Sequence, residues 1–384
     1  GGAIMEVAEV IAKKLRELQD EYDLNQSEMG EIIGVTRQTF ARYLNGERLM
    51  DSGKLYKLAK YFNKNIDYFL TDKTKIDEMA FMFRADDPEN NFDKKLKDKI
   101  ADKFRLYHDI IELSDDPLKD YLPEEYNLKI EGDQLSSKEK AAIEKIAEKQ
   151  RRYIGVDDAL NINVFTLFEE NNINIIAREI DNLNLDAVSA YSKDKGAFIF
   201  INDSRDIPEE RKIFTVVHEL GHLILHRDEY SEDINNLKYS NSRIKNIREK
   251  AADYFAMSFL IPKKVLKNYS YYFDGYIDLD LIIEKKQEFG VSAAALIVTL
   301  KEYGYIDNRI LESLFKKLRN AGYDKKEPEP RDYIKKNEKI QALFRKLIIK
   351  EEITVNKAAE TLGISVLEMR KLAKKWKNYE YRTA

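Results

Sequence analysis

The stretch VVHELGHLILH, residues 216–226, holds three of the four histidines in the chain. His218 and His222 are four residues apart, so a helix would place both rings on one face, with about 5–6 Å between their Cβ atoms. Two imidazoles at that spacing can bind one zinc ion, and Glu219 beside them can act as general base on a water molecule. The motif alone leaves open an ordinary helix with a polar stripe.

A catalytic zinc ion takes three protein ligands, so the third must come from elsewhere in the chain. His226 follows His218 by eight residues, a rise of about 12 Å on a straight helix, which is too far for one ion. Glu249, in the segment EKAAD of the next predicted helix, is the better candidate. Asp253, one turn further on, is expected to accept a hydrogen bond from the non-ligating nitrogen of His218 and to fix its tautomer. We therefore predict a zinc site with His218, His222 and Glu249 as ligands.

The segments before this motif predict a helix, a strand and a hairpin. SSKEKAAIEKIAEKQRRYIG opens with a capping box that pairs Ser136 or Ser137 with Glu139 or a neighbour. VFTLFEENNINIIAREI predicts a helix followed by a strand, and DAVSAYSKDKGAFIFIN predicts a hairpin with Gly196 at its turn. Residues 197–201 are expected to form either a sheet edge beside the metal, where an extended substrate adds as a further strand, or a plain core strand.

RKIFTVVHELGHLILH followed by REKAADYFAMSFLIP resembles the ImmA/IrrE family of metallopeptidases, which have a gluzincin-like zinc site. The resemblance covers roughly residues 137–305 and implies the same ligands and the same general base as the spacing does. Ala251 stands where many members have a second acidic residue. Because Glu249 and Asp253 remain four residues apart, Ala251 is interpreted as tolerated. Tyr191 is a candidate for the oxyanion-stabilising residue.

The segment NQSEMGEIIGVTRQTFARYLNGERL, residues 25–49, predicts two helices separated at Gly34, the second capped by Thr36. It resembles the helix-turn-helix of the XRE family of phage-repressor-like regulators, and the resemblance covers residues 5–72. In that mode the second helix lies in the major groove of DNA. The expected contacts are Gln26 to the DNA backbone, Thr36 at the start of the reading helix, Arg37 to guanine or phosphate, Gln38 to adenine and Arg42 to phosphate.

Two features favour the alternative that this helical module binds protein instead of DNA. Acidic residues slightly outnumber basic ones between residues 1 and 72, which weakens the electrostatic attraction that usually dominates DNA affinity. Gly30 replaces the alanine usual in such motifs, which is expected to loosen the pairing of the two helices. XRE-type domains commonly bind as dimers, so a homodimer is expected.

The same helix-turn-helix rhythm occurs three times, in GVTRQTFARYL, GVSAAALIVTL and GISVLEMRKLA, which begin at Gly34, Gly290 and Gly363. The second repeat has no basic or amide side chain where a DNA reader needs one, and it predicts core scaffold. The third is basic. It could contact phosphate or an acidic partner, but a solvated helix face is the favoured interpretation.

Composition bounds the remaining choices. The chain has 384 residues, a formal net charge of −4 and no cysteine, so disulfides and cysteine-based zinc sites are excluded. No run of about 18 apolar residues and no signal-peptide pattern is present, and we expect a cytoplasmic protein without a membrane span. The expected fold is mainly α with a small β-sheet in the peptidase domain (α+β). Its expected parts are an all-α helix-turn-helix domain (4–72), a helical and irregular connection (73–136), a zinc metallopeptidase domain (137–308) and a basic helical C-terminal region (309–384).

The leading hypothesis is a zinc-dependent endopeptidase fused to a DNA-binding head. By resemblance, its substrate is a transcriptional repressor or related regulator, whose cleavage relieves repression. The alternative is a DNA-binding regulator, or an antitoxin-like protein, whose zinc site is structural or sensory and does not turn over. An open fourth position on the metal favours the enzyme.

Overall fold

The computed structural model of the chain divides into two compact units, Gly1–Ile76 and Asp77–Ala384. The described residues are 2–22, 24–62, 66–70, 80–83, 94–114, 124–126, 128, 130, 132–180, 185–192, 196–227, 242–323, 326–362 and 364–383. The strand and helix content confirms the α+β fold expected from the sequence. Within the described residues, no helix combines the length and apolar character needed to cross a membrane.

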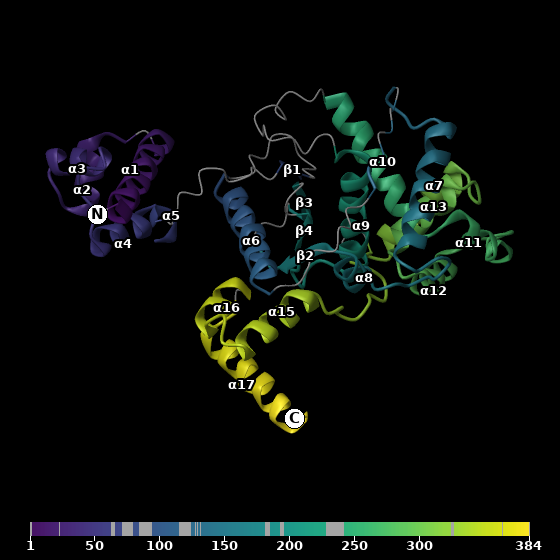
Figure 1. Ribbon diagram of the computed structural model, residues 1–384. Helices are drawn as coiled ribbons and strands as arrows, with labels where there is room; N and C mark the ends of the chain where they lie inside the picture. Colours follow the sequence, from purple (N-terminus) through teal and green to yellow (C-terminus); the bar gives the residue numbers. More distant parts are fainter. Residues whose placement is uncertain are drawn as a thin grey trace. The chain divides into compact units, whose positions relative to one another are not determined.

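The first unit is built from helices, as the sequence predicts (Figure 1). They are α1 (Gly2–Tyr22), α2 (Gln26–Ile33), α3 (Arg37–Leu44), α4 (Ser52–Tyr61) and α5 (Asp67–Leu70). Their apolar faces meet in one core that includes Leu15, Leu18, Met29, Phe40 and Leu58. These positions follow the helical spacing of apolar residues in the sequence, so burial of one stripe from each helix holds the unit together.

Specific caps define the boundaries of α2 and α3. Asn25 and Glu28 form a capping box at the start of α2. Gly34 ends α2 with a left-handed backbone, φ 75°, which glycine adopts without strain. Thr36 accepts the N–H of Thr39 at 3.3 Å, so the predicted cap of α3 is confirmed.

Gly30 lies where α2 and the following turn approach most closely. A Cβ added there would stand 2.8 Å from the carbonyl oxygen of Val35, and the Val35 N–H donates to the Gly30 carbonyl at 2.8 Å. A backbone oxygen cannot move aside as a side chain would. The glycine therefore permits the close approach, and the expectation that it loosens the helix pairing is wrong.

Gly30→Ala is expected to destabilise the first unit by about 1 kcal/mol, because overpacking costs about 1–3 kcal/mol and the helix propensity of alanine returns about 1 kcal/mol. The matched variant Gly53→Ala meets only the Asp51 carboxylate, at 3.3 Å, and should stabilise α4 instead. Calorimetric unfolding of the full chain measures both. Equal effects of the two substitutions would contradict the steric account of Gly30.

The second unit contains a four-stranded sheet in the order β1-β3-β4-β2. Its strands are β1 (Ala80–Phe83), β2 (Ile173–Arg178), β3 (Ala187–Ser192) and β4 (Gly196–Asn202). β3 and β4 form the predicted antiparallel hairpin, and β2 runs parallel to β4. Because β4 is paired on both sides, residues 197–201 form a core strand, one of the two alternatives that the sequence left open, and not a sheet edge. β1 falls in a segment for which the sequence indicates no strand.

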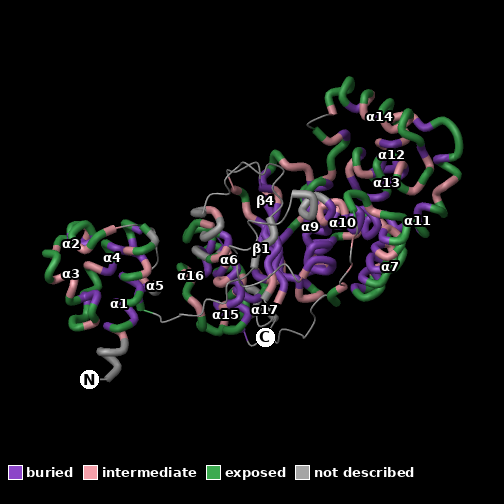
Figure 2. The backbone as a smooth tube through the Cα atoms, turned by 90° about the horizontal axis from the view of Figure 1, so that it is seen from above, coloured by how far each residue is buried: buried purple, intermediate pink, exposed green. Residues whose placement is uncertain are grey.

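The two faces of the sheet bury side chains in two different cores. Alternate residues of a strand point to opposite faces, so Ile199 and Ile201 pack towards α9 while Phe198 and Phe200 pack towards α6 and α15. Figure 1 shows the strands between α6 and α9, and Figure 2 shows this region as mostly buried. Covering both faces explains why nearly every residue of β4 is apolar and buried.

The helices of the second unit build these layers. They are α6 (Lys94–Leu113), α7 (Ser137–Tyr153), α8 (Val164–Glu170), α9 (Glu209–Leu225), α10 (Ser242–Leu260), α11 (Lys263–Lys267), α12 (Leu279–Phe289), α13 (Ala293–Glu302), α14 (Asn308–Asn320), α15 (Glu338–Ile349), α16 (Val355–Leu362) and α17 (Val366–Thr383), with a short 3-10 helix at Ser270–Tyr272. The capping box of Ser136 with Glu139 is confirmed at the start of α7. Leu296 and Ile297 of α13 are fully buried, so the repeat beginning at Gly290 is core scaffold, as predicted.

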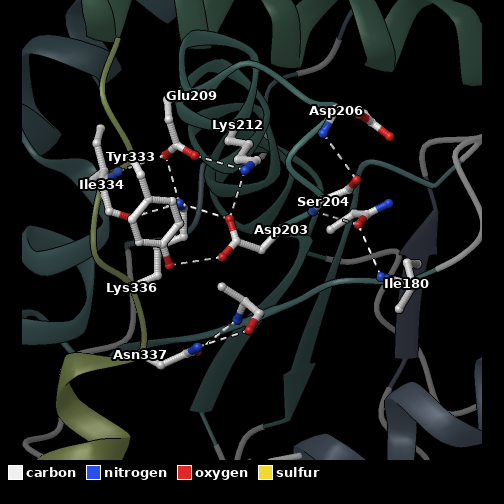
Figure 3. A network of polar contacts seen from close by, with 12 residues as sticks. Ile180, Asp203, Ser204, Asp206, Glu209, Lys212, Tyr333, Ile334, Lys336 and Asn337 are labelled. Carbon is white, nitrogen blue, oxygen red and sulfur yellow. Dashed lines mark hydrogen bonds and ion pairs between the residues drawn. The ribbon is translucent and has the colours of Figure 1, made fainter.

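A buried ion network fastens the segment before α15 to the start of α9 (Figure 3). The Lys336 ammonium lies 2.7 Å from Glu209 and 2.9 Å from Asp203, and Lys212 pairs with the same two carboxylates. The Tyr333 hydroxyl donates to Asp203 at 3.2 Å. Buried charges are costly unless paired, so this network fixes where the chain crosses α9.

Two polar side chains join the start of α15 to the sheet and to α8. Asn337, with a left-handed backbone (φ 59°), donates from its amide to the Ala177 carbonyl at 2.9 Å and accepts the Ala177 N–H at 2.8 Å. Glu169 accepts the first backbone N–H groups of α15, from Glu338 and Lys339. Burial raises the pKa of the Glu169 carboxyl to about 7, against the opposing effect of these hydrogen bonds.

Candidate metal centre

The centre is formed where α9 and α10 pack side by side, and Gly221 makes this packing close. A Cβ added at Gly221 would lie 3.1 Å from Phe255 Cδ1 and 3.3 Å from Ala252 Cα. The glycine inside the HELGH motif therefore lets α10 approach the histidine face of α9. Ala251 is also fully buried. Many members of the ImmA/IrrE family have an acidic residue at this position, whereas this chain has a small apolar residue that packs in the core.

The three predicted ligands converge on one point. The Nε2 atoms of His218 and His222 are 3.0 Å apart. Glu249 Oε2 lies 3.3 Å from His218 Nε2, and Glu249 Oε1 lies 3.5 Å from His222 Nε2. Both imidazoles are buried, whereas the Glu249 side chain is partly exposed. The group meets the spacing of a metal site, with one ligand atom from each residue within 4.8 Å of the others.

These separations fit a small divalent cation. Bonds of 2.0–2.2 Å at tetrahedral angles place ligand atoms about 3.3 Å apart, close to the observed separations. Burial lowers the pKa of His218, but its hydrogen bonds to Asp253 and Glu249 outweigh burial and give a pKa of about 9. Burial raises the pKa of Glu249, but the two imidazoles outweigh this and lower it. The carboxylates thus make the pocket favourable for positive charge.

Asp253 lies where the sequence expects it, 2.8 Å from the Nδ1 atom of His218. A carboxylate only accepts hydrogen bonds, so Nδ1 carries a proton, and Nε2 is the nitrogen that binds an ion once it has released its own proton. This arrangement fixes both the tautomer and the ring orientation of His218.

His226 lies behind His222 and outside the ligand group. Its Nδ1 atom is 3.0 Å from His222 Nδ1. Burial lowers the pKa of His226 well below its usual value, so it is a neutral partner. When His222 directs its Nε2 lone pair to the centre, its Nδ1–H donates to His226. The rejection of His226 as a ligand agrees with this placement.

Glu219 lies beside the ligands and is held by a residue that sequence reasoning missed. Ser189 on β3 donates its hydroxyl proton to Glu219 Oε2, and both side chains are buried. Glu219 Oε1 has no hydrogen-bond partner within the described part of the chain. One oxygen is therefore positioned while the other remains able to take a proton. The sequence carries no signal that sets Ser189 apart, because β3 contains a second serine, Ser192.

A cavity of 690 Å³ adjoins the centre at Asp253. It lies between α7, α9, α10 and α13, and apolar side chains such as Phe214, Met257 and Val298 line it together with charged ones. Tyr191, the candidate for stabilising an oxyanion, is half-buried on β3, and its ring lies 4.7 Å from the Arg227 guanidinium. Its role in stabilising an oxyanion stays a prediction.

The expected DNA contacts lie at α2 and α3 of the first unit. Thr36, Arg37, Gln38 and Arg42 are exposed, and Gln26 at the start of α2 is partly exposed. The Arg42 guanidinium lies 3.8 Å from Glu47, and its side chain is two-thirds exposed. Each of these side chains is at least partly accessible, which contact with DNA requires.

Gly221→Ala is expected to force α9 and α10 apart and to reduce zinc affinity at least about tenfold, equivalent to about 1.4 kcal/mol. Competition titration with a chromogenic chelator measures the affinity. Phe255→Val removes the nearest obstructing atom, Cδ1, so the double variant should recover part of the loss. Additive effects of the two substitutions would show that helix separation is not the cause.

Each of the two units matches a known protein family. The family model described as the IrrE N-terminal-like domain, of the M78 peptidases, matches residues 168–301, and a helix-turn-helix family model matches residues 13–69. The chain is 31% identical over 113 residues to the cryptic phage CTXphi transcriptional repressor RstR of Vibrio cholerae, covering 29% of this chain and 81% of that protein. It is 28% identical over 117 residues to an HTH-type transcriptional regulatory protein of Pyrococcus furiosus, covering 29% of this chain.

The chain matches only 34% of the length of the Pyrococcus protein. Together the comparisons show a DNA-binding regulator domain joined to a peptidase-like domain. M78 peptidases are typically metal-dependent, and the convergent histidine and glutamate side chains supply a candidate metal-binding group.

Proposed function

Because the chain belongs to the XRE-type helix-turn-helix regulators and carries an IrrE-like M78 peptidase domain, we propose that it is a zinc-dependent endopeptidase that cleaves a transcriptional repressor or related regulator. The observation that carries the proposal is the convergence of His218, His222 and Glu249 beside Glu219. A purely structural zinc site needs no proton acceptor next to its ligands. Here a buried carboxylate oxygen without a partner among the described residues lies next to the ligands.

His218, His222 and Glu249 would hold the ion and leave its fourth position for water and substrate. A bound zinc ion lowers the pKa of water and polarises the scissile carbonyl group. Glu219 Oε1 takes the proton from the attacking water as its oxygen bonds to the carbonyl carbon, while Ser189 keeps Oε2 in place. Glu219 then gives this proton to the leaving nitrogen as the C–N bond breaks. Asp253 and His226 orient the two imidazoles throughout.

The helix-turn-helix unit suggests that the protein encounters its substrate on DNA. Binding of this unit near an operator raises the local concentration of a repressor bound at the same DNA, which increases the rate of encounter without a new contact. As a homodimer on DNA, the chain would place two reading helices about 34 Å apart. The proposed substrate is therefore a DNA-bound regulator.

The test is incubation of the full chain with the repressor encoded beside its gene, and intact-mass measurement of the products. Zinc-loaded protein should cut the repressor at a defined bond, chelated protein should not, and added zinc should restore cutting. Zinc bound at one ion per chain without any cleavage, together with operator affinity that changes with zinc, would overturn the proposal in favour of a zinc-sensing regulator.

A further inference from the structure

The C-terminal helices α16 and α17 repeat the geometry of α2 and α3 at a constant offset of 329 residues. In the first unit the Val35 N–H donates to the Gly30 carbonyl at 2.8 Å. In the second unit the Ile364 N–H donates to the Ala359 carbonyl at 3.1 Å. This bond closes the turn between the two helices, so both segments bend in the same register.

The caps follow the same offset. Thr39 N–H donates to Thr36 Oγ1 at 3.3 Å in the first unit. The corresponding Glu368 N–H donates to Ser365 Oγ at 3.1 Å. The first helices match as well, since Thr354 caps α16 at the position that Asn25 occupies before α2. Capping at matching positions fixes where each helix begins.

The buried positions also coincide. Met29, Ile33 and Phe40 are buried in the first motif, and the buried residues at the corresponding positions are Ala358, Leu362 and Met369. Equivalent burial on both helices means that the same face of the second helix points outwards. The segment is therefore a helix-turn-helix by hydrogen bonds, caps and core, and not only by the rhythm of its sequence.

The outward face of α17 is strongly basic. Between Val366 and Lys377 there are five basic residues and one acidic residue. The five, all exposed, are Arg370, Lys371, Lys374, Lys375 and Lys377. The single acidic residue, Glu368, accepts hydrogen bonds from the Ser365 N–H and hydroxyl. A basic face along a reading helix complements the phosphate backbone of DNA.

The residues at the tip of α17 differ from those of α3 in one respect. Val366 and Leu367, both exposed, occupy the positions of Arg37 and Gln38. Aliphatic side chains cannot donate hydrogen bonds to base edges, although they can contact thymine methyl groups. Lys371, in contrast, keeps the positive charge of Arg42. The motif can thus contact phosphates through Lys371. At the positions of Arg37 and Gln38 it lacks side chains that could form hydrogen bonds with base edges.

The core of the second unit holds this motif in place. Phe344 and Leu347 of α15, Ala358 of α16 and Met369 of α17 belong to the core on the α6 side of the sheet. In Figure 1 α15 and α16 lie beside α6, and α17 runs from them to the C-terminal end. The basic face is therefore presented by a packed scaffold.

We propose that α16 and α17 form a second DNA-binding element, which places α17 on duplex DNA mainly through phosphate contacts and independently of sequence. The first unit has a slight acidic excess between residues 1 and 72, so its own electrostatic attraction to DNA is weak. The basic α17 adds to the attraction that Arg37 and Arg42 supply in the first unit. Duplex DNA is the partner because its charge and its groove match a basic helix in helix-turn-helix geometry. The proposal does not depend on the metal centre.

The test measures binding of the full chain to an arbitrary duplex of about 30 base pairs by fluorescence anisotropy, between about 50 and 200 mM salt. The background carries Arg37→Ala and Gln38→Ala, so that α3 reads no bases. In this background Lys371→Gln, Lys374→Gln and Lys375→Gln are combined. The slope of log affinity against log salt should fall by about 2–3, because each lost phosphate contact removes about 0.9, and low-salt affinity should fall at least about tenfold.

The matched control replaces three exposed basic residues on one face of α7, namely Lys138→Gln, Lys145→Gln and Arg152→Gln. It removes the same charge and should change the slope by much less. Equal slopes for the two triple variants would overturn the proposal. A triple variant of α17 that binds DNA like the background protein, but no longer binds or cuts a protein substrate, would also overturn it and assign α17 to a protein partner.

Discussion

Replacing Glu219 with glutamine is expected to slow peptide cleavage by about 10²–10⁴-fold while zinc remains bound. Glutamine keeps the shape of the side chain and can still accept the Ser189 hydroxyl proton, but it cannot take a proton from water. Single-turnover cleavage of the repressor measures the rate, and mass spectrometry of the native protein measures the zinc. Because the ligands are unchanged, the loss should appear in the rate constant and not in metal content.

The matched control is Glu148→Gln, the same substitution at an exposed position of α7. It should cleave at the wild-type rate. If Glu219→Gln and Glu148→Gln cleave equally fast, Glu219 is not the general base, and the proposed mechanism fails even if zinc is present.

Replacing Glu249 with alanine is expected to weaken zinc binding by about a hundredfold or more. Tetrahedral sites bind zinc with about 10–16 kcal/mol shared among four ligands, so one ligand contributes on the order of 3 kcal/mol. Glu249 is the sole ligand that α10 supplies to the group, and without it the two imidazoles of α9 must hold the ion alone. Zinc content after dialysis, with anomalous scattering to locate the ion, measures the effect.

The control for this prediction is Lys250→Ala, one residue further along α10. The Lys250 ammonium donates to the backbone carbonyl of Asp133, outside the ligand group, so its loss should leave zinc bound. Full zinc occupancy in Glu249→Ala, at the same position between His218 and His222, would contradict the three-ligand site. The hydrolytic proposal would then lose its structural basis.

The sequence predicted those features that depend on local spacing. His218 and His222 share a helix face because they are four residues apart, and Thr36 caps α3 because hydroxyl side chains accept N–H groups at helix starts. Glu249 was found because the carboxylate pair with Asp253 repeats the same four-residue spacing on a second helix. Each of these signals lies within one turn of one helix.

Features that depend on distant contacts were not predictable in the same way. Ser189 meets Glu219 across 30 positions of sequence, and nothing in its neighbours marks it. The sequence left open whether β4 lies at an edge or inside the sheet, because an apolar strand pattern does not show which strands pair with it. Phe198 and Phe200 indicate a second buried face, but the sequence does not say that α6 and α15 cover it.

Asn337 has a consequence for how any extended polypeptide can meet the sheet. Its amide occupies both backbone groups of Ala177 on the edge strand β2, as a neighbouring strand would. An unpaired edge invites foreign strands, including those of other copies of the same chain. This one side chain therefore blocks the edge at Ala177, so that neither a substrate segment nor a growing aggregate can pair with the strand at that residue.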